Sequence, residues 1–322
     1  MNKQAVLLLD FGGPSNLDAV GPFLTELFSD RAILPLPIGR KTIARLITAC
    51  RLKKVQEQYQ LIGGGSPLIP QTQKLARDLQ KRLAQSGLHL PVYTAMRYTP
   101  PFIAETLWRM VQDDIHKMVV LPMFPQFSFA TTGSVFGELE KILQKKAPDL
   151  KAIFVREWWQ KEEFLLGWCQ VIHRALASLP SDAREGAHLL FTAHSLPVRL
   201  VKMKNDPYPG QIHQCVTKII EMLGLSNAWH LSFQSKIGPV KWLGPSTMET
   251  VKKLGHQGVK NLIFIPISFL TDHIETLYEV DQLLIPEAKA AGVEQCVRTE
   301  ALVQTPHLAQ ALEKIVLEKI LQ

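Results

Sequence analysis

The sequence predicts an α/β protein of two similar Rossmann-like domains, each a parallel sheet flanked by helices, around a central cleft. Three observations indicate this class. Short apolar runs alternate with amphipathic segments along the 322 residues, as they do in βαβ units. The second half of the chain repeats the order of motifs in the first half. The unusual polar residues follow the apolar runs, at the edge where open α/β sheets bind ligands.

The strand candidates are apolar runs of the length typical of buried strands. They are residues 5–10, 91–96, 117–122, 152–156, 187–193, 228–233 and 261–267. Between them the apolar residues recur with a helical period, and we expect helices over 70–86 and 135–146. The segment 307–321 places Leu308, Leu312 and Ile315 on one face, which predicts a last helix.

A weak internal duplication supports two similar domains. The stretch VLLLDFGGP (6–14) resembles LLFTAHSLP (189–197), and MVVLPMFPQFS (118–128) resembles NLIFIPISFLT (261–271). In each half an apolar strand is followed by small or polar residues and then by proline, in the same order. Such repetition is typical of a chain that folds the same unit twice.

The duplication predicts an N-terminal domain over 1–165 and a C-terminal domain over 166–322, with the last helix packing back on the first domain. Residues 30–66 have no counterpart in the second half. From Arg31 to Gln56 this insertion has seven cations, no acid and several aliphatic residues. It is either a buried helical hairpin or a lip that rests on an anionic membrane or admits an apolar substrate. We favour the lip.

Composition narrows the class of partner. The chain is 46% hydrophobic and 20% charged, as in ordinary globular proteins. Its net charge of +7 suits an anionic partner such as an acidic lipid or an acidic small molecule. No zinc finger, RNA-binding motif or helix-turn-helix pattern is apparent, so we expect no nucleic-acid partner.

The cysteines and the lengths of the apolar runs indicate the cellular compartment in which the protein is expected. Cys50, Cys169, Cys215 and Cys296 lie far apart, which favours reduced thiols over disulfides or a zinc or iron–sulfur site. The first strand candidate begins near the N-terminus without a leader-like segment, and no apolar run has the length of a membrane span. We therefore expect a cytoplasmic protein.

The segment IFIPISFLTDHIETLYEVD (263–281) changes from a buried strand to acidic residues beside an imidazole. On a helix Asp272, Glu275 and Glu279 share one face. They form either a solvated face that complements the helix dipole or, with His273, a set of ligands for a divalent cation. Because the stripe follows a strand end in a basic protein, we favour the cation site.

Another candidate is His194, at the end of the strand HLLFTA. A histidine there can be a packed or capping residue, or a group that accepts a proton near neutral pH. Aromatic residues also gather at strand ends, and they either belong to the core or line a flat slot for a planar ligand. They are Phe11, Phe127, Phe129, Trp242 and Phe269.

Several motifs in order resemble the ferrochelatase family, whose members insert Fe(II) into a porphyrin to make haem. They are LLLDFGGP, QEQYQLIGGGSPL, AMRYTP, LPMFPQFSFATTGS, FTAHSLP, FQSKIGPVKWLGPST and PISFLTDHIETLYEVD. The match runs from about residue 4 to residue 320. The resemblance implies a lyase of haem biosynthesis with two chelatase-type domains.

The resemblance assigns expected roles to particular residues. It implies that His194 and Glu275 are catalytic, on opposite sides of the porphyrin plane, and that both bind the metal. Asp272, His273 and Glu279 correspond to the path that conducts metal or protons. The residues expected to bind porphyrin or its propionates are Phe11, Arg97, Tyr98, Ser128, Thr131, Gln234, Ser235, Trp242 and Phe269.

The resemblance also carries expectations about cofactors and partners. Ferrous iron is a substrate, and we expect no cofactor and no iron–sulfur cluster. An upstream porphyrin oxidase and an iron donor are candidate partners. We expect a monomer with a peripheral position on the inner face of the cell membrane.

Some residues depart from the family pattern, and alternatives remain open. Asp10 stands where asparagine is common, Phe11 where some relatives have tyrosine, and Gln60-Leu61 replace a basic pair of animal relatives. We expect protoporphyrin IX as substrate. The alternatives are coproporphyrin III, a chelatase or carrier for another tetrapyrrole, and a periplasmic-type binding protein.

Overall fold

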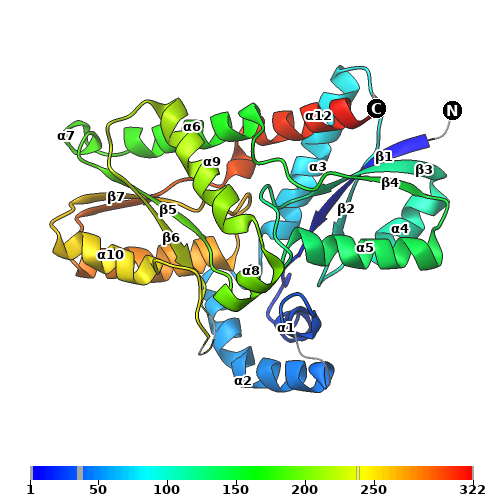
Figure 1. The fold of residues 1–322 in the computed structure, drawn as a ribbon, viewed down its shortest axis with the longest axis horizontal. Helices are drawn as coiled ribbons and strands as arrows, with labels where there is room; N and C mark the ends of the chain where they lie inside the picture. Colours follow the sequence, from blue (N-terminus) through cyan, green and yellow to red (C-terminus); the bar gives the residue numbers. More distant parts are fainter. Residues whose placement is uncertain (1–2, 35–38, 237, 239, 321–322) are drawn as a thin grey trace. The chain divides into compact units, whose positions relative to one another are not determined.

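The computed structural model of the protein describes residues 3–34, 39–236, 238 and 240–320. The chain divides into two compact units. The N-terminal unit comprises Met1–Trp158 and Ala309–Gln322, and the C-terminal unit comprises Trp159–Leu308. Each unit contains a four-stranded parallel sheet with helices beside it (Figure 1). The prediction of two similar units, each a parallel sheet flanked by helices, is therefore confirmed.

The sheet of the N-terminal unit has the order β2-β1-β3-β4. Its strands are β1 (Lys3–Asp10), β2 (Val92–Met96), β3 (Ile115–Pro122) and β4 (Lys151–Phe154). Its helices are α1 (Val20–Ser29), α2 (Arg40–Leu61), α3 (Leu68–Gln85), α4 (Ile103–Gln112) and α5 (Thr132–Lys146), and most of α12 (Pro306–Ile320) joins them. In α12, Glu313 accepts hydrogen bonds from Arg82 Nε (2.7 Å) and Ser86 Oγ (2.6 Å) of the α3 region.

The sheet of the C-terminal unit has the corresponding order β6-β5-β7-β8. Its strands are β5 (His188–His194), β6 (Trp229–Gln234), β7 (Asn261–Ile265) and β8 (Gln295–Arg298). Its helical segments are α6 (Glu162–Ala177), α7 (Ser181–Arg184), α8 (Val198–Lys204), α9 (Tyr208–Leu223), α10 (Thr247–His256), η1 (Glu275–Leu284), α11 (Ile285–Ala290) and η2 (Leu302–Gln304). In each sheet the strand that comes second along the chain therefore lies at one edge, next to the strand that comes first.

The central strands are apolar along their whole length because helices cover both faces of a parallel sheet. In β1 the residues from Ala5 to Leu9 are fully buried, and in β5 those from Leu189 to Phe191 are too. Polar side chains are therefore concentrated where these strands end, at Asp10 and His194. All strand candidates of the sequence form strands, and β8 is an additional one.

The segment η1 is a π-helix, in which backbone N–H groups bond to carbonyls five residues earlier. At its end the amide of Ile285 bonds to the carbonyl of Val280. The sequence predicts one acidic helix face that includes Asp272, but the helical segment begins after this residue. The reason is local. Asp272 Oδ1 accepts a hydrogen bond from Thr276 Oγ1 (3.0 Å), so Asp272 precedes the helical segment and its side chain contacts the first turn.

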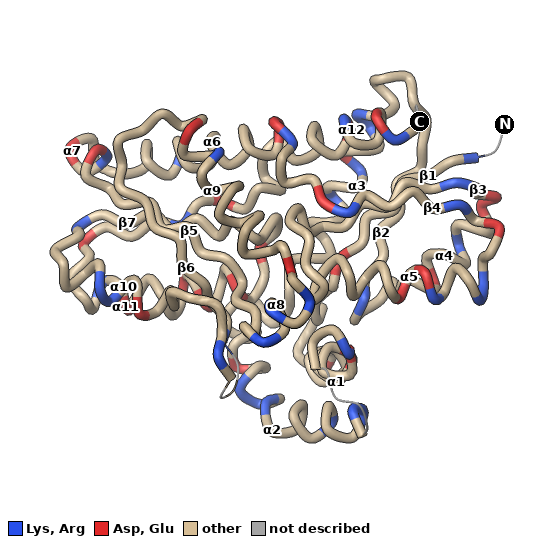
Figure 2. The backbone as a smooth tube through the Cα atoms, viewed as in Figure 1, with Lys and Arg blue, Asp and Glu red and all other residues tan. Residues whose placement is uncertain are grey.

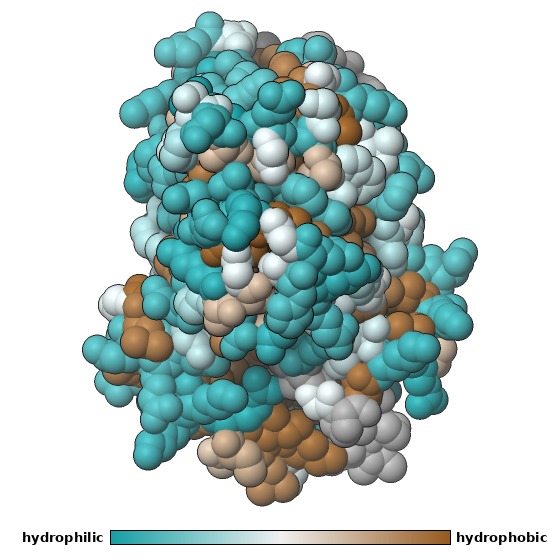
Figure 3. Space-filling view, turned by 90° about the vertical axis from the view of Figure 1, so that its left-hand side faces the viewer, coloured by the Kyte–Doolittle hydropathy of each residue, from teal (hydrophilic) through white to brown (hydrophobic). Residues whose placement is uncertain are grey.

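The insertion contains α2, which packs against α1 and buries Ala44, Thr48, Val55 and Tyr59. The insertion also contains the apolar sequence ILPLPI (33–38), of which residues 35–38 lie outside the described residues. Lysine and arginine recur along α2, as Figure 2 shows in blue, and Lys41, Arg45, Lys53 and Lys54 are exposed. Leu46 and Leu61 are exposed on the same helix, at 62% and 63% of their surface. Figure 3 shows apolar surface at the bottom of the view, and Figure 1 places α2 at the bottom as well.

No helix among the described residues is both long enough and apolar enough to cross a membrane.

Candidate functional site

The backbone of His194 is held on both sides at the end of β5. Its N–H donates to Ser268 Oγ (3.0 Å), and its carbonyl accepts from the hydroxyl of Tyr208 (3.0 Å). The residue pairs in register with Gln234 at the end of β6. Ser268 and Tyr208 were not among the predicted site residues, although Ser268 follows a strand as the predicted residues do.

The imidazole of His194 has a defined tautomer. Nδ1 lies 2.7 Å from the carbonyl oxygen of Ser195. Because a carbonyl only accepts hydrogen bonds, Nδ1 must carry a proton. In the neutral ring Nε2 therefore has the lone pair and can accept a proton or bind a cation. The ring also packs edge-on against Phe269, with centroids 6.3 Å apart.

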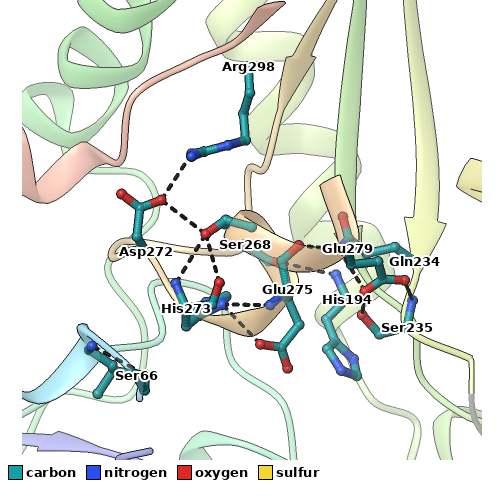
Figure 4. Close-up of polar contacts among 12 residues, drawn as sticks. Ser66, His194, Gln234, Ser235, Ser268, Asp272, His273, Glu275, Glu279 and Arg298 are labelled. Carbon is teal, nitrogen blue, oxygen red and sulfur yellow. Dashed lines mark hydrogen bonds and ion pairs between the residues drawn. The ribbon is translucent and has the colours of Figure 1, made fainter. Parts of the chain in front are cut away.

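Glu275 is the first residue of η1, and its carboxylate is paired with an imidazole. His273 Nδ1 lies 2.9 Å from Glu275 Oε2. Burial alone raises the pKa of Glu275, but the charge and hydrogen bond of His273, together with the charge of His194, lower it to about 2. Glu275 is therefore a carboxylate at neutral pH. Figure 4 shows its side chain and the His194 ring pointing to the same side.

Further along η1, Glu279 is held by donors from the end of β6. Gln234 Nε2 donates to Oε2 (2.9 Å) and the Ser235 amide donates to Oε1 (2.7 Å), while the Ser235 hydroxyl also donates to Oε2. Gln234 Nε2 bonds to the Glu275 carbonyl as well (2.9 Å). Ser235 adopts a φ of 67°, which L-residues rarely occupy and which aims its N–H at Glu279.

Trp242 lies beside the chain that follows His194. It forms an antiparallel bridge with Pro197, and the next amide, of Leu243, donates to the Leu196 carbonyl (2.9 Å). The indole Nε1 of Trp242 is buried and has no hydrogen-bond partner among the described residues. Phe269 is also buried and contacts His273 edge-on, with centroids 4.7 Å apart. The C-terminal unit thus brings two predicted aromatics to its cluster of histidines and carboxylates.

In the N-terminal unit the predicted pair Arg97 and Tyr98 surrounds a buried carboxylate. The hydroxyl of Tyr98 donates to Asp30 Oδ2 (2.8 Å), and Arg97 Nη2 lies 3.4 Å from the same oxygen. The hydroxyl of Ser134 donates to it too. Burial raises the pKa of Asp30, yet the bonds from Ser134, Ala32 and Tyr98 and the Arg97 charge lower it overall. The sequence offered no signal for Asp30, which lies far from Tyr98 along the chain.

The guanidinium of Arg97 retains capacity to bind an anion. Its Nη2 lies 3.7 Å from Glu138 Oε2, a long ion pair, and its Nε is buried without a hydrogen-bond partner among the described residues. Phe11 packs nearby against the rings of Tyr98 and Phe124, with centroids 5.1 and 4.7 Å away. Arg97, Tyr98 and Phe11 therefore lie together.

Ser128 and Thr131 shape the start of α5. The Ser128 hydroxyl accepts from the amide of Ala130 (3.1 Å), and its carbonyl accepts from the amides of Thr131 (3.2 Å) and Gly133 (2.9 Å). These bonds close a tight turn just before the helix. The hydroxyl of Ser128 is buried.

Asp10, which departs from the family pattern, has a structural role at the end of β1. Its Oδ1 accepts from the amide of Phe11 (2.7 Å), and Thr72 lies 3.5 Å from Oδ2. The next residue but one, Gly12, has a φ of 81°, and a Cβ there would lie 2.0 Å from Thr99 Oγ1. Gly12, the first of the two glycines in LLLDFGGP, thus permits a turn that a side chain would block.

Within the described residues, no three His, Cys, Asp or Glu side chains gather in an arrangement that could hold a metal ion. The predicted cation ligands His194, Asp272, His273, Glu275 and Glu279 therefore do not form a closed metal site by themselves.

Comparison with known proteins gives a consistent result. A family model described as Ferrochelatase matches residues 3–320. The ferrochelatase of Synechococcus elongatus is 41% identical over 321 residues, which cover 98% of this chain and 82% of the relative. The ferrochelatase of Trichodesmium erythraeum is 39% identical, with coverage of 99% and 83%.

Solved structures share the fold at low sequence identity. SirB from Bacillus subtilis with Fe³⁺ has a TM-score of 0.59 at 14% identity, covering 98% of this chain and 95% of SirB. DR2241 from Deinococcus radiodurans, a multi-domain protein with structural similarity to chelatases, has a TM-score of 0.54 at 12% identity. It is covered over 54% of its length, and this chain over 97%.

Proposed function

Because the chain belongs to the ferrochelatase family, we propose that it inserts Fe(II) into protoporphyrin IX and releases two protons, the terminal step of haem biosynthesis. It is an enzyme of the porphyrin metal chelatase type, a lyase. The observation that carries the proposal is the pairing of a proton-accepting Nε2 on His194 with the anionic carboxylate of Glu275 in one cluster. Metal insertion requires both, a base for the pyrrole protons and an anion for the dication.

His194 is the proton acceptor in this proposal. The Nδ1–H bond to the Ser195 carbonyl fixes the ring, so that Nε2 is available without a tautomer change. When Nε2 takes a proton, the same carbonyl still accepts from Nδ1. Nε2 holds one proton at a time, so it must pass the first pyrrole proton to solvent before it accepts the second.

Glu275 acts as an anion rather than as a base. With a pKa of about 2 it keeps no proton at neutral pH, so it is poorly suited to remove one from a pyrrole. Its carboxylate suits a hydrated divalent cation, which prefers oxygen ligands and exchanges water stepwise. Glu279, further along η1, adds a second negative charge to this segment, while both of its oxygens accept hydrogen bonds from Gln234 or Ser235.

The aromatic and cationic residues bind the porphyrin in this proposal. Phe269, which packs against the His194 imidazole, and Trp242, which bridges Pro197, offer apolar surface to the macrocycle. The buried, unpartnered Nε of Arg97 and its long ion pairs suit a propionate carboxylate, which can accept the unused donor.

The choice of porphyrin is tested by direct comparison. The purified protein is given Fe(II) anaerobically with protoporphyrin IX or coproporphyrin III, and kcat/KM is measured for each from the loss of the free-base visible bands. We expect the higher kcat/KM with protoporphyrin IX. A higher value with coproporphyrin III would reassign the substrate, and binding of both without metallation, even with Zn(II), would indicate a carrier.

The lip is proposed to rest on the anionic cytoplasmic face of the cell membrane. The observation behind this is the pairing of exposed Leu46 with exposed cations at Lys41, Arg45, Lys53 and Lys54 on α2. Sedimentation with vesicles of phosphatidylglycerol should recover more protein than vesicles of phosphatidylcholine. The variant Lys53→Glu/Lys54→Glu should lose this difference, and an unchanged difference would place the contact elsewhere.

The remaining assignments concern cofactors and partners. We propose a cytoplasmic monomer without nucleic-acid partner or iron–sulfur cluster, which receives porphyrin and iron from an upstream oxidase and an iron donor. The separation of the cysteines along the chain supports the absence of a cluster. Protein purified anaerobically should contain no inorganic sulfide, and stoichiometric sulfide would contradict this.

A further inference from the structure

Arg298, the last residue of β8, holds both ends of the segment that carries the candidate catalytic carboxylates. Its Nε and Nη2 form a two-pronged pair with the carboxylate of Asp281, at 2.7 and 2.9 Å. Its Nη1 donates to Asp272 Oδ1 over 3.0 Å. Figure 4 shows the guanidinium aimed at Asp272. Glu275 and Glu279 lie between these two anchored residues.

The contacts of Arg298 are mostly withdrawn from water. Its side chain is 13% exposed, and those of Asp272 and Asp281 are 18% and 28% exposed. Two-pronged arginine–carboxylate pairs restrict geometry more than single contacts because the planar fork fixes distance and orientation together. The arrangement therefore limits the movement of Asp281 on η1 and of Asp272 before it.

The same residue links this segment to the strand of His194. Arg298 pairs in register with Phe264 of β7, and β7 pairs with β5, which ends at His194. A displacement of η1 relative to the sheet would thus change the position of Glu275 with respect to the His194 imidazole. Misplacement of reacting groups by about 1 Å can lower a rate by about 100-fold.

We propose that Arg298 is a positioning residue for metal insertion, which holds Glu275 and Glu279 in place through Asp272 and Asp281. This assignment rests on the proposed function. It also gives Asp272 a different role from the metal path implied by the family resemblance. Its Oδ1 is occupied by Arg298 and by Thr276 Oγ1, each at 3.0 Å, so Asp272 serves to anchor the segment.

Two substitutions test the assignment. Arg298→Lys keeps the charge but cannot form the two-pronged pair, and Asp281→Asn removes the negative charge and replaces one of the two accepting oxygens with a donor. We expect kcat with Fe(II) and protoporphyrin IX to fall by about 10-fold to 100-fold in each, with KM for porphyrin within about two-fold. The double variant should lose little more than the single variants, because both changes break the same contact.

The matched control is Arg174→Lys, in the same unit. Arg174 Nη1 pairs with Glu300 over 2.6 Å, but this pair is exposed and touches neither Asp272 nor Asp281. The control should keep the kcat of the wild type. Thermal unfolding of each variant, with kcat measured well below the midpoint, separates a loss of turnover from a loss of folded protein.

The outcomes distinguish this assignment from the proposed function. A wild type that metallates protoporphyrin, with Arg298→Lys and Asp281→Asn equally fast, would overturn the positioning role alone. A fall in kcat that matches the fall in folded fraction would overturn it too, because a merely structural contact behaves in this way. A wild type without chelatase activity would overturn both.

Discussion

The Nδ1 atom of His194 donates a hydrogen bond to the carbonyl oxygen of Ser195 over 2.7 Å. This bond leaves Nε2 as the only nitrogen of the neutral ring that can accept a proton. The backbone of His194 is itself fixed by Ser268 and Tyr208, so the direction of Nε2 follows from the sheet and its neighbours. The structure thus prepares one proton acceptor before any substrate binds.

Removal of this acceptor should reduce turnover while porphyrin binding persists. We expect His194→Ala to lower kcat by about 100-fold to 10,000-fold, the usual contribution of a general base. The Kd for protoporphyrin, measured by fluorescence titration, should change by less than about three-fold, because the aromatic residues remain. A variant that turns over at near-normal rate would contradict the role of His194.

The carboxylate of Glu275 should matter for the metal more than for the porphyrin. Glu275→Gln keeps the size of the side chain but removes the charge that attracts the dication and lies beside His273 Nδ1. We expect a fall in kcat/KM for the metal of at least about 100-fold, measured with Zn(II) and Fe(II). The control Glu294→Gln, which breaks the exposed pair with Lys260, should be indistinguishable from the wild type.

The strained backbone of Ser235 gives a prediction about stability. Ser235→Gly and Ser235→Ala both remove the hydroxyl that bonds to Glu279, but only glycine adopts a φ of 67° without cost. Urea denaturation should therefore show Ser235→Gly to be more stable than Ser235→Ala by about 1 kcal/mol. Equal stabilities, or a more stable alanine variant, would show that this conformation carries no strain.

The stability of the C-terminal unit should fall in mild acid because of a histidine pair. His188 Nδ1 lies 2.9 Å from His230 Nε2, across β5 and β6. Burial lowers the pKa of both imidazoles, and the charges of His188 and Lys253 lower the pKa of His230 further. The folded-state pKa values thus lie below the ordinary value of 6.5. The unfolded chain then binds protons more readily, so this stabilisation is complete above about pH 6.5 and is lost as the pH falls through the folded values.

Urea denaturation as a function of pH measures this effect. The free energy of unfolding should decrease from neutral pH toward pH values of about 5, and His230→Gln should reduce the slope. His256→Gln, at the end of α10, serves as the control. The same slope in wild type and His230→Gln would assign the acid sensitivity to other groups.

Much of the fold is visible in the sequence because its signals are local. Buried parallel strands read as apolar runs, and the repeat of VLLLDFGGP in LLFTAHSLP reflects the same strand order in both sheets. The strand β8 has only the four residues QCVR, without an apolar run, so it carries no such signal. Its last residue, Arg298, was missed together with it.

The candidate site was predicted only where its residues follow strands. His194 ends β5, Glu275 lies in the segment that follows β7, and the ends of these neighbouring parallel strands meet at one edge. Asp30 and Tyr208 have no such position, and they contribute through contacts formed only in the folded chain. The predicted spacing of Asp272 with Glu275 assumed one regular helix, whereas the pair with Arg298 and the π-helix η1 depend on tertiary packing.

One measurement tests the central claim most directly, namely that His194 accepts the porphyrin protons in a true metallation reaction. Wild type and His194→Ala are each saturated with protoporphyrin IX and mixed anaerobically with Fe(II), and the absorbance is followed from free-base porphyrin to haem in a single turnover. We predict conversion to haem by the wild type and retained free-base porphyrin, still bound, in His194→Ala. Conversion at the same rate in both, or bound porphyrin that neither protein metallates, would contradict the account.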